Sequence, residues 1–489
     1  MEKCVVRRET GTGPRRKTFK FSEPPFARCE VCSKTGEACD GGQPCALCVS
    51  RLSQCRYYSI PSSAENKLSP GHVANKLWTY PDWSREAIRL RVPELKFTLF
   101  HGVDTQLSLW FNEEQVHHLL SVYTVTYHTH FPLMHFPSFK VETCDIHLLA
   151  ALVMMGTVWE PTCTLRETRE MMELLYAPAE MAMVSSEEVS LQSAQCMFLL
   201  IVMYAWHGSS QQRSNAPAKF ATLSGVLRKA GFLLEQPTPT TWRWQEWADQ
   251  ESRARVTLHY LMLDASMVIF FNIPPNFGSL EIRVDMPCDD EAWESDNPAE
   301  VQKLVSSRPR LSFPNALQML LSPDLEFPAD CCNEFGRGVL IHAIHNHIWT
   351  AQHYLLPQQP KSASEDFVDV MSNALEKWRG AFQEQSTVRD GGRHQRAGFC
   401  RDGEPYFWLA KLFLAKDRQT EWDQAHGELD TAAKVHKQLI YIQNFLRQQG
   451  GTPEAAGERN RFSEEYGLSE DKCDLSLLLV VQRKDVKWY

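Results

Sequence analysis

The sequence lacks any uninterrupted apolar run of the roughly 18 residues that a membrane-spanning helix needs. Its longest apolar runs include residues 148–155 and 196–206, and both are shorter than that. The first 25 residues contain no apolar h-region, so we expect no secretory signal. We therefore expect no membrane association and an intracellular, reducing setting, where cysteines bind metals or stay free thiols rather than form disulfides.

The sequence also lacks the short motifs of common enzymes. It contains no Gly-x-Ser-x-Gly, Walker loop, Gly-x-Gly-x-x-Gly or His-Glu-x-x-His pattern, so we expect a protein that is not an enzyme. Strand-like alternation of apolar and polar residues is scarce. With 43% hydrophobic and 23% charged residues, however, the 489-residue chain can build a large core.

Charge is distributed unevenly along the chain. Residues 1–60 hold 11 basic and 6 acidic residues, a net charge of +5, whereas the remainder holds 40 basic and 54 acidic residues, a net charge of −14. A basic segment ahead of an acidic body indicates either contact with a polyanion or a solvated basic tail.

Six of the 15 cysteines lie within 27 residues, with the spacing C-x2-C-x6-C-x5-C-x2-C-x6-C. They are Cys29, Cys32, Cys39, Cys45, Cys48 and Cys55. Thiolates at C-x2-C spacing can reach one ion, and zinc takes four ligands in a tetrahedron. Six cysteines satisfy two Zn²⁺ ions if two thiolates each bridge both metals. The alternatives are one four-cysteine zinc site with two spare thiols and, less favoured, an iron–sulfur cluster.

This segment resembles the fungal Zn2Cys6 binuclear zinc cluster, a DNA-binding domain of transcription factors. The loop Cys39-Asp40-Gly41-Gly42-Gln43-Pro44-Cys45 matches the family's C-D-G-x-x-P-C loop. The resemblance implies two Zn²⁺ ions, with Cys29 and Cys45 as bridging ligands. It also implies double-stranded DNA as a partner, at a promoter site such as a GC-rich half-site.

The stretch between the second and third cysteines departs from the family's basic pattern. It reads Ser33-Lys34-Thr35-Gly36-Glu37-Ala38, in which Lys34 is the single basic residue. Gly36 stands where the family usually has a lysine that reads DNA. A glycine costs about 1 kcal/mol in a helix and has no side chain to donate to a base, so we expect weak or altered DNA reading.

Basic residues outside this stretch offer phosphate contacts, which position a protein on DNA without specifying sequence. With Lys34, the candidate DNA-binding residues are Arg15, Arg16, Lys17, Arg28, Arg51 and Arg56. The run at residues 15–17 equally suits a nuclear import signal. We therefore expect the protein in the nucleus.

The rest of the chain predicts an all-α body. Apolar residues recur at helical spacing from about Pro93 to residue 448. The expected helices span residues 114–126, 194–206, 218–233, 251–272, 335–355, 364–383, 404–414 and 430–448. The Ser-, Pro- and Gly-containing stretch before them reads as a linker and shows no coiled-coil heptads.

Two passages of the body resemble the fungal-specific transcription factor regulatory domain, also called the middle homology region. One is residues 130–139, HFPLMHFPSF. The other starts with the E-x-R-x-R pattern of Glu251, Arg253 and Arg255 and ends at residues 286–293, MPCDDEAW. We interpret these motifs as structural. His135 is expected in the core, and Arg253, Arg255 and Asp264 are expected to form buried ion pairs.

The predicted fold is thus a small Zn2Cys6 binuclear cluster domain followed by a large all-α helical domain. We divide the chain into a basic tail (1–28), the cluster (29–58), a linker (59–90), the regulatory domain (91–448, best matched at 100–300) and a mostly disordered tail (449–489). The expected function is a zinc-dependent nuclear transcription regulator, either a homodimer or a heterodimer, that responds to coregulators or a small-molecule effector. The alternative is a zinc-containing interaction or modulator protein without sequence-specific DNA binding.

Overall fold

The computed structural model describes residues 83–102, 108, 111–128, 131–158, 160, 163–236, 241–307, 310–328, 332–389 and 403–415. Its α-helices are α3 (Arg85–Phe100), α5 (Glu113–Tyr123), α6 (Ile146–Thr157), α7 (Leu165–Ser185), α8 (Leu191–His207), α9 (Ser210–Lys229), α10 (Trp244–Phe271), α11 (Asp290–Glu294), α12 (Pro298–Ser307), α13 (Phe313–Leu321), α14 (Glu334–Thr350), α15 (Lys361–Arg389) and α16 (Glu404–Ala415). Short π or 3₁₀ turns are η1 (Thr124–His128), η2 (Val141–Thr143), η3 (Ala351–Leu355) and η4 (Leu356–Gln358). Within these ranges the only β-pairing is an isolated bridge between Asp285 and Ser312. The prediction of a large helical domain is confirmed.

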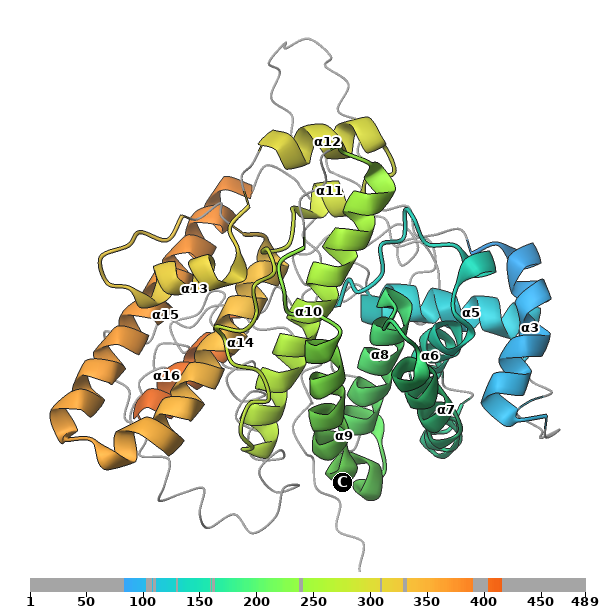
Figure 1. Ribbon diagram of the computed structural model, residues 1–489, viewed down its shortest axis with the longest axis horizontal. Helices are drawn as coiled ribbons and strands as arrows, with labels where there is room; N and C mark the ends of the chain where they lie inside the picture. Colours follow the sequence, from blue (N-terminus) through green and yellow to red (C-terminus); the bar gives the residue numbers. More distant parts are fainter. Residues whose placement is uncertain are drawn as a thin grey trace, which may run out of the picture. The chain divides into compact units, whose positions relative to one another are not determined.

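Helix α10 is the central element of this domain. It packs against α8 on one side and α14 on the other, as Figure 1 shows. Helices α3 and α5 to α9 pack together on the α8 side, and α13, α15 and α16 pack with α14. One continuous apolar core runs through both groups. Side chains buried around the whole of α10, from Val256 to Ile269, therefore join the two halves of the core.

Helix α10 also has the length and composition of a membrane span, contrary to the expectation from the sequence. However, 94% of its most apolar window is buried inside the protein. The core helix of a soluble domain passes the same test, and the burial of α10 explains its apolar character without a bilayer.

Polar residues at the helix starts fix where the helices begin. Asp145 accepts hydrogen bonds from the first amides of α6, and Ser190 does so for α8. Thr164 forms a complete capping box with Glu167 at the start of α7, and Ser209 forms one with Gln212 at the start of α9. These caps satisfy backbone N–H groups that have no partner within the helix.

Three helix starts lie well before the sequence prediction: α10 begins at Trp244 rather than at residue 251, and the other two differences involve proline. Helix α3 begins at Arg85, inside the predicted linker, and continues through Pro93. Helix α9 begins at Ser210 rather than at residue 218 and continues through Pro217. A proline inside a helix removes one hydrogen bond, but packing of apolar side chains such as Ile88 offsets that loss. The predicted helix at 430–448 lies outside the described residues.

Candidate regulatory site

Two residues of the E-x-R-x-R pattern on α10, Glu251 and Arg255, belong to a buried cluster of charges. Glu251 and Arg255 lie one helical turn apart, and Arg255 Nε donates to Glu251 Oε1 at 2.9 Å with both side chains 0% exposed. Arg310, 59 residues further along the chain, donates to the other carboxylate oxygen of Glu251. Burial opposes ionisation of Glu251, but Arg310 and Arg255 outweigh burial and hold its pKa below the ordinary value.

This cluster also fixes the segment around Cys288. The Cys288 amide donates to Glu251 Oε1 at 2.9 Å, and its carbonyl accepts from Arg255 Nη2 at 2.9 Å. The same carbonyl accepts from Nδ2 of Asn333, the residue that caps α14. The Arg255 guanidinium lies 4.1 Å from the ring centre of Trp293. Helices α10, α11 and α14 are therefore joined through one buried ion pair and its hydrogen bonds.

The prediction of ion pairs is confirmed for Arg255 and is wrong for Asp264 and Arg253. Asp264 accepts instead from the backbone amides of Asn276 and Phe277, each at 2.9 Å, and thereby fixes the chain after α10. Burial raises the Asp264 pKa to about 6. Arg253 points away from the buried cluster, and its Nη2 donates to the Ala230 carbonyl at 2.9 Å.

His135 lies in the core, as predicted. Its Nδ1 is 2.7 Å from the Ser138 hydroxyl, and its ring contacts Trp244, Trp247 and Trp293. Burial lowers its pKa to about 4, so the ring is neutral near pH 7. The neutral ring packs as an aromatic side chain among the three tryptophans.

The histidines of α14 are also packing residues. His342 Nδ1 donates to the Gly338 carbonyl at 2.7 Å, and His345 Nε2 donates to the Tyr406 carbonyl at 2.8 Å. Among the described residues, no group of three or more His, Cys, Asp or Glu side chains is arranged to hold a metal ion. The described cysteines outside the predicted zinc ligands are buried free thiols, Cys144, Cys163, Cys196, Cys288 and Cys332.

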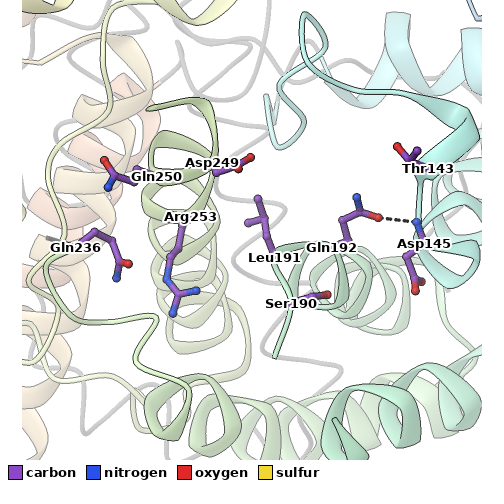
Figure 2. A pocket seen from close by; sticks show the side chains of 9 residues that line it. All are labelled: Thr143, Asp145, Ser190, Leu191, Gln192, Gln236, Asp249, Gln250 and Arg253. Carbon is purple, nitrogen blue, oxygen red and sulfur yellow. Dashed lines mark hydrogen bonds between the residues drawn. The ribbon is translucent and has the colours of Figure 1, made fainter. Parts of the chain in front are cut away.

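A polar pocket of about 610 Å³ opens between the start of α10 and the starts of α6 and α8. Its α10 side carries Asp249, Gln250 and Arg253, and Figure 2 shows the residues that precede or begin α6 and α8 across from them. The lining residues are Thr143, Asp145, Ser190, Leu191, Gln192, Gln236, Asp249, Gln250 and Arg253.

Hydrogen bonds fix much of the pocket wall. The Gln192 amide oxygen accepts from the Asp145 backbone amide at 2.5 Å, drawn as the dashed line in Figure 2. Ser190 Oγ accepts from the Ser193 amide at 3.0 Å as the cap of α8. On the other wall, the Arg253 guanidinium lies 3.9 Å from the ring centre of Phe232. The pocket is therefore lined by side chains that already have defined positions.

The sequence alone does not reveal this pocket, although one of its lining residues, Arg253, was expected in a buried ion pair. Its residues come from segments separated by up to about a hundred positions, and no local spacing relates them. The one signal available was on α10, where residues 249 and 253 share a helix face. The six predicted zinc ligands and the predicted DNA-binding residues all lie outside the described residues, so those predictions stay predictions.

Comparison with known proteins identifies the family. The profile of the fungal specific transcription factor domain matches residues 120–380, more than half of the chain. A transcription factor of Penicillium polonicum, verF, is 21% identical over 355 residues, covering 62% of this chain and 47% of the relative. The zinc finger protein zas1 of Schizosaccharomyces pombe is 21% identical over 291 residues, covering 56% of this chain and 32% of the relative.

A transcription factor of Zymoseptoria tritici is 28% identical over 120 residues, covering 23% of this chain and 12% of the relative. The chain thus spans about half or less of the length of these relatives. No solved structure matches. The profile match covers both motif regions of the buried core, the histidine passage and the charged cluster on α10. The chain therefore belongs to the family of proteins with a fungal-specific transcription factor domain.

Proposed function

We propose that the protein is a zinc-dependent nuclear transcription regulator. The observation that carries the proposal is the six-cysteine pattern at residues 29–55. It lies ahead of residues 120–380, which match the profile of the fungal specific transcription factor domain. Two Zn²⁺ ions held by Cys29, Cys32, Cys39, Cys45, Cys48 and Cys55 supply the folding energy of a segment too short to build a core. Relatives named as transcription factors support a regulatory rather than an enzymatic role.

DNA contact in this proposal comes mainly from phosphates. The candidate residues are seven of the 11 basic residues in the first 60 positions: Arg15, Arg16, Lys17, Arg28, Lys34, Arg51 and Arg56. Such contacts position the protein and make binding strongly salt-dependent. The helical domain, whose α8, α10 and α14 form one packed unit, responds to an effector or a coregulator.

The second candidate is a zinc-containing modulator that lacks sequence-specific DNA binding. It rests on Ser33–Ala38, where Glu37 adds a charge that repels phosphate and Gly36 offers no side chain to a base edge. Such a protein would act by forming a heterodimer with a related factor or by competing for its partners.

One set of experiments separates the two. Zinc content is measured on the purified full chain, and DNA binding is measured by gel shift with random and GC-rich duplexes at low salt. A variant with Cys29 and Cys45 changed to serine is the control. Binding above this control supports the regulator. If specific binding appears only after Ser33, Thr35 and Gly36 are replaced by basic residues, the modulator is supported.

A further inference from the structure

Arg253 is a half-buried cation with no ion-pair partner in the part of the chain that the structure describes. Its Nη2 donates to the Ala230 carbonyl, and the guanidinium stacks on Phe232, so its position is fixed. Within the described residues, its Nε and Nη1 donate no hydrogen bond, and its side chain makes no polar contact beyond these. A fixed guanidinium that is partly removed from water and faces a pocket is prepared to pair with an anionic group.

The anions of the pocket are not used to neutralise this cation. Asp249 lies one turn before Arg253 on α10, yet the two form no ion pair, and Asp249 Oδ1 accepts from Gln245 at 3.2 Å. Asp145 Oδ1 accepts from the His147 amide at 2.9 Å as the cap of α6 and lies 3.3 Å from Nδ1 of the His147 ring, so this oxygen is already used. The second oxygen of each carboxylate accepts no hydrogen bond from another described residue. The pocket therefore offers one cation and two anions, each with capacity for a further partner.

The charge balance selects the ligand. One guanidinium and two carboxylates give the lining a net charge of −1, so a polyanion such as nucleic acid is repelled. A complementary ligand carries one carboxylate and two ammonium groups. The pocket volume of about 610 Å³ lies within the range of ~300–1,000 Å³ typical of small-molecule sites.

We propose that this pocket binds a basic amino-acid-type metabolite, with its carboxylate on Arg253 and its ammonium groups on Asp249 and Asp145. The proposal rests on the proposed regulatory function, because it names the class of effector that the helical domain senses. The ligand would connect α10 to the starts of α6 and α8. The same helix α10 carries Glu251 and Arg255, which fix the Cys288 segment and α14.

The test is isothermal calorimetry on the full-length zinc-loaded protein with L-ornithine, L-lysine and L-arginine as probes. L-Leucine and 1,5-diaminopentane are the comparison ligands, since each lacks one of the required charges. We expect a basic amino acid to bind and both comparison ligands to bind at least about tenfold more weakly. Arg253→Gln and Asp249→Asn should each weaken binding about tenfold or more.

Arg243→Gln is the matched control, because Arg243 lies at the start of the same helix, 71% exposed and away from the pocket lining. Its affinity should equal that of the unchanged protein. Asp249→Asn keeps the inference testable if Arg253→Gln unfolds, since Asp249 is exposed and, among the described residues, its side chain hydrogen-bonds with Gln245 alone. Thermal unfolding of each variant monitors folding.

The proposal is overturned if no basic amino acid gives heat of binding or raises the melting temperature at about 10 mM. Equal binding to the unchanged protein, Arg253→Gln and Asp249→Asn also overturns it. Zinc-dependent DNA binding is measured separately on the same preparations without ligand. A chain that binds DNA but no amino acid refutes the pocket inference alone, and a chain that binds the amino acid but no DNA refutes the direct regulator alone.

Discussion

Replacing Glu251 by glutamine should destabilise the helical domain strongly. The change preserves the shape of the side chain but removes the charge that faces Arg255, whose side chain is 0% exposed, and Arg310, whose side chain is 27% exposed. Leaving a buried charge without its partner costs about 3–5 kcal/mol. At roughly 2 °C per kcal/mol for a domain of this size, the melting temperature should fall by about 6–10 °C.

The measurement is thermal unfolding followed by circular dichroism at pH 7, with Glu246→Gln as the matched control. Glu246 lies on the same helix and pairs with Arg243 at 3.1 Å, but the two side chains are 46% and 71% exposed. Exposed pairs contribute at most about 1 kcal/mol, so the control should change the melting temperature by about 2 °C or less. The contrast isolates burial, since both variants lose one carboxylate on α10.

The pH dependence provides an independent check. The Glu251 pKa is held below its ordinary value in the folded protein. A carboxyl group of this kind contributes stability above its unfolded pKa, and that contribution is lost as the pH falls through the folded pKa. The difference between the unchanged protein and Glu251→Gln should therefore shrink in acid. If Glu251→Gln lowers the free energy of unfolding by less than about 1 kcal/mol at pH 7, the idea that it leaves a buried charge without a partner is wrong.

Three further predictions concern packing, titration and metal. Gly156→Ala should destabilise the folded protein by about 1–3 kcal/mol, because an added Cβ would lie 2.3 Å from the Leu119 carbonyl oxygen. Gly225→Ala should instead stabilise its helix by ~0.5–1 kcal/mol, because nothing lies within 4 Å of the added Cβ. Chemical denaturation of both variants measures these free energies. The pKa of Asp264 is about 6 in the folded protein, above the ordinary 3.8, so this carboxyl group should make the protein less stable as the pH rises from about 4 to 7. Asp264→Asn should lack this decline. Urea midpoints that change in parallel with pH for both proteins would contradict the prediction. Removing zinc with a chelator should abolish gel-shift binding while leaving the helical circular dichroism signal of the domain largely unchanged, and loss of both signals together would show that the helical domain also depends on the metal.

Some helices could be predicted from local sequence, whereas others, including α3, α6, α7, α12 and α13, were not among the expected helices. The apolar face of residues 114–126 and the apolar run at 194–206 correspond to α5 and α8. Pro93 and Pro217 lie at or just before the starts of the expected helical stretches, and proline is unfavourable inside a helix. The structure keeps both within helices, since the tertiary contacts of neighbouring apolar side chains outweigh one lost hydrogen bond.

The sequence by itself determined the family, the all-α body and the six-cysteine pattern, because each depends on residue types at fixed short spacings. The sequence also placed Arg255 in a buried ion pair, but it named Arg253 and Asp264 with it, and the structure shows that Glu251, one turn before Arg255, is the partner. Only the tertiary structure showed that Arg310 joins them and that Asp264 binds backbone amides. It alone also assembled the pocket, because Asp145, Gln192 and Arg253 meet through the packing of three helices and not through any periodicity of the chain.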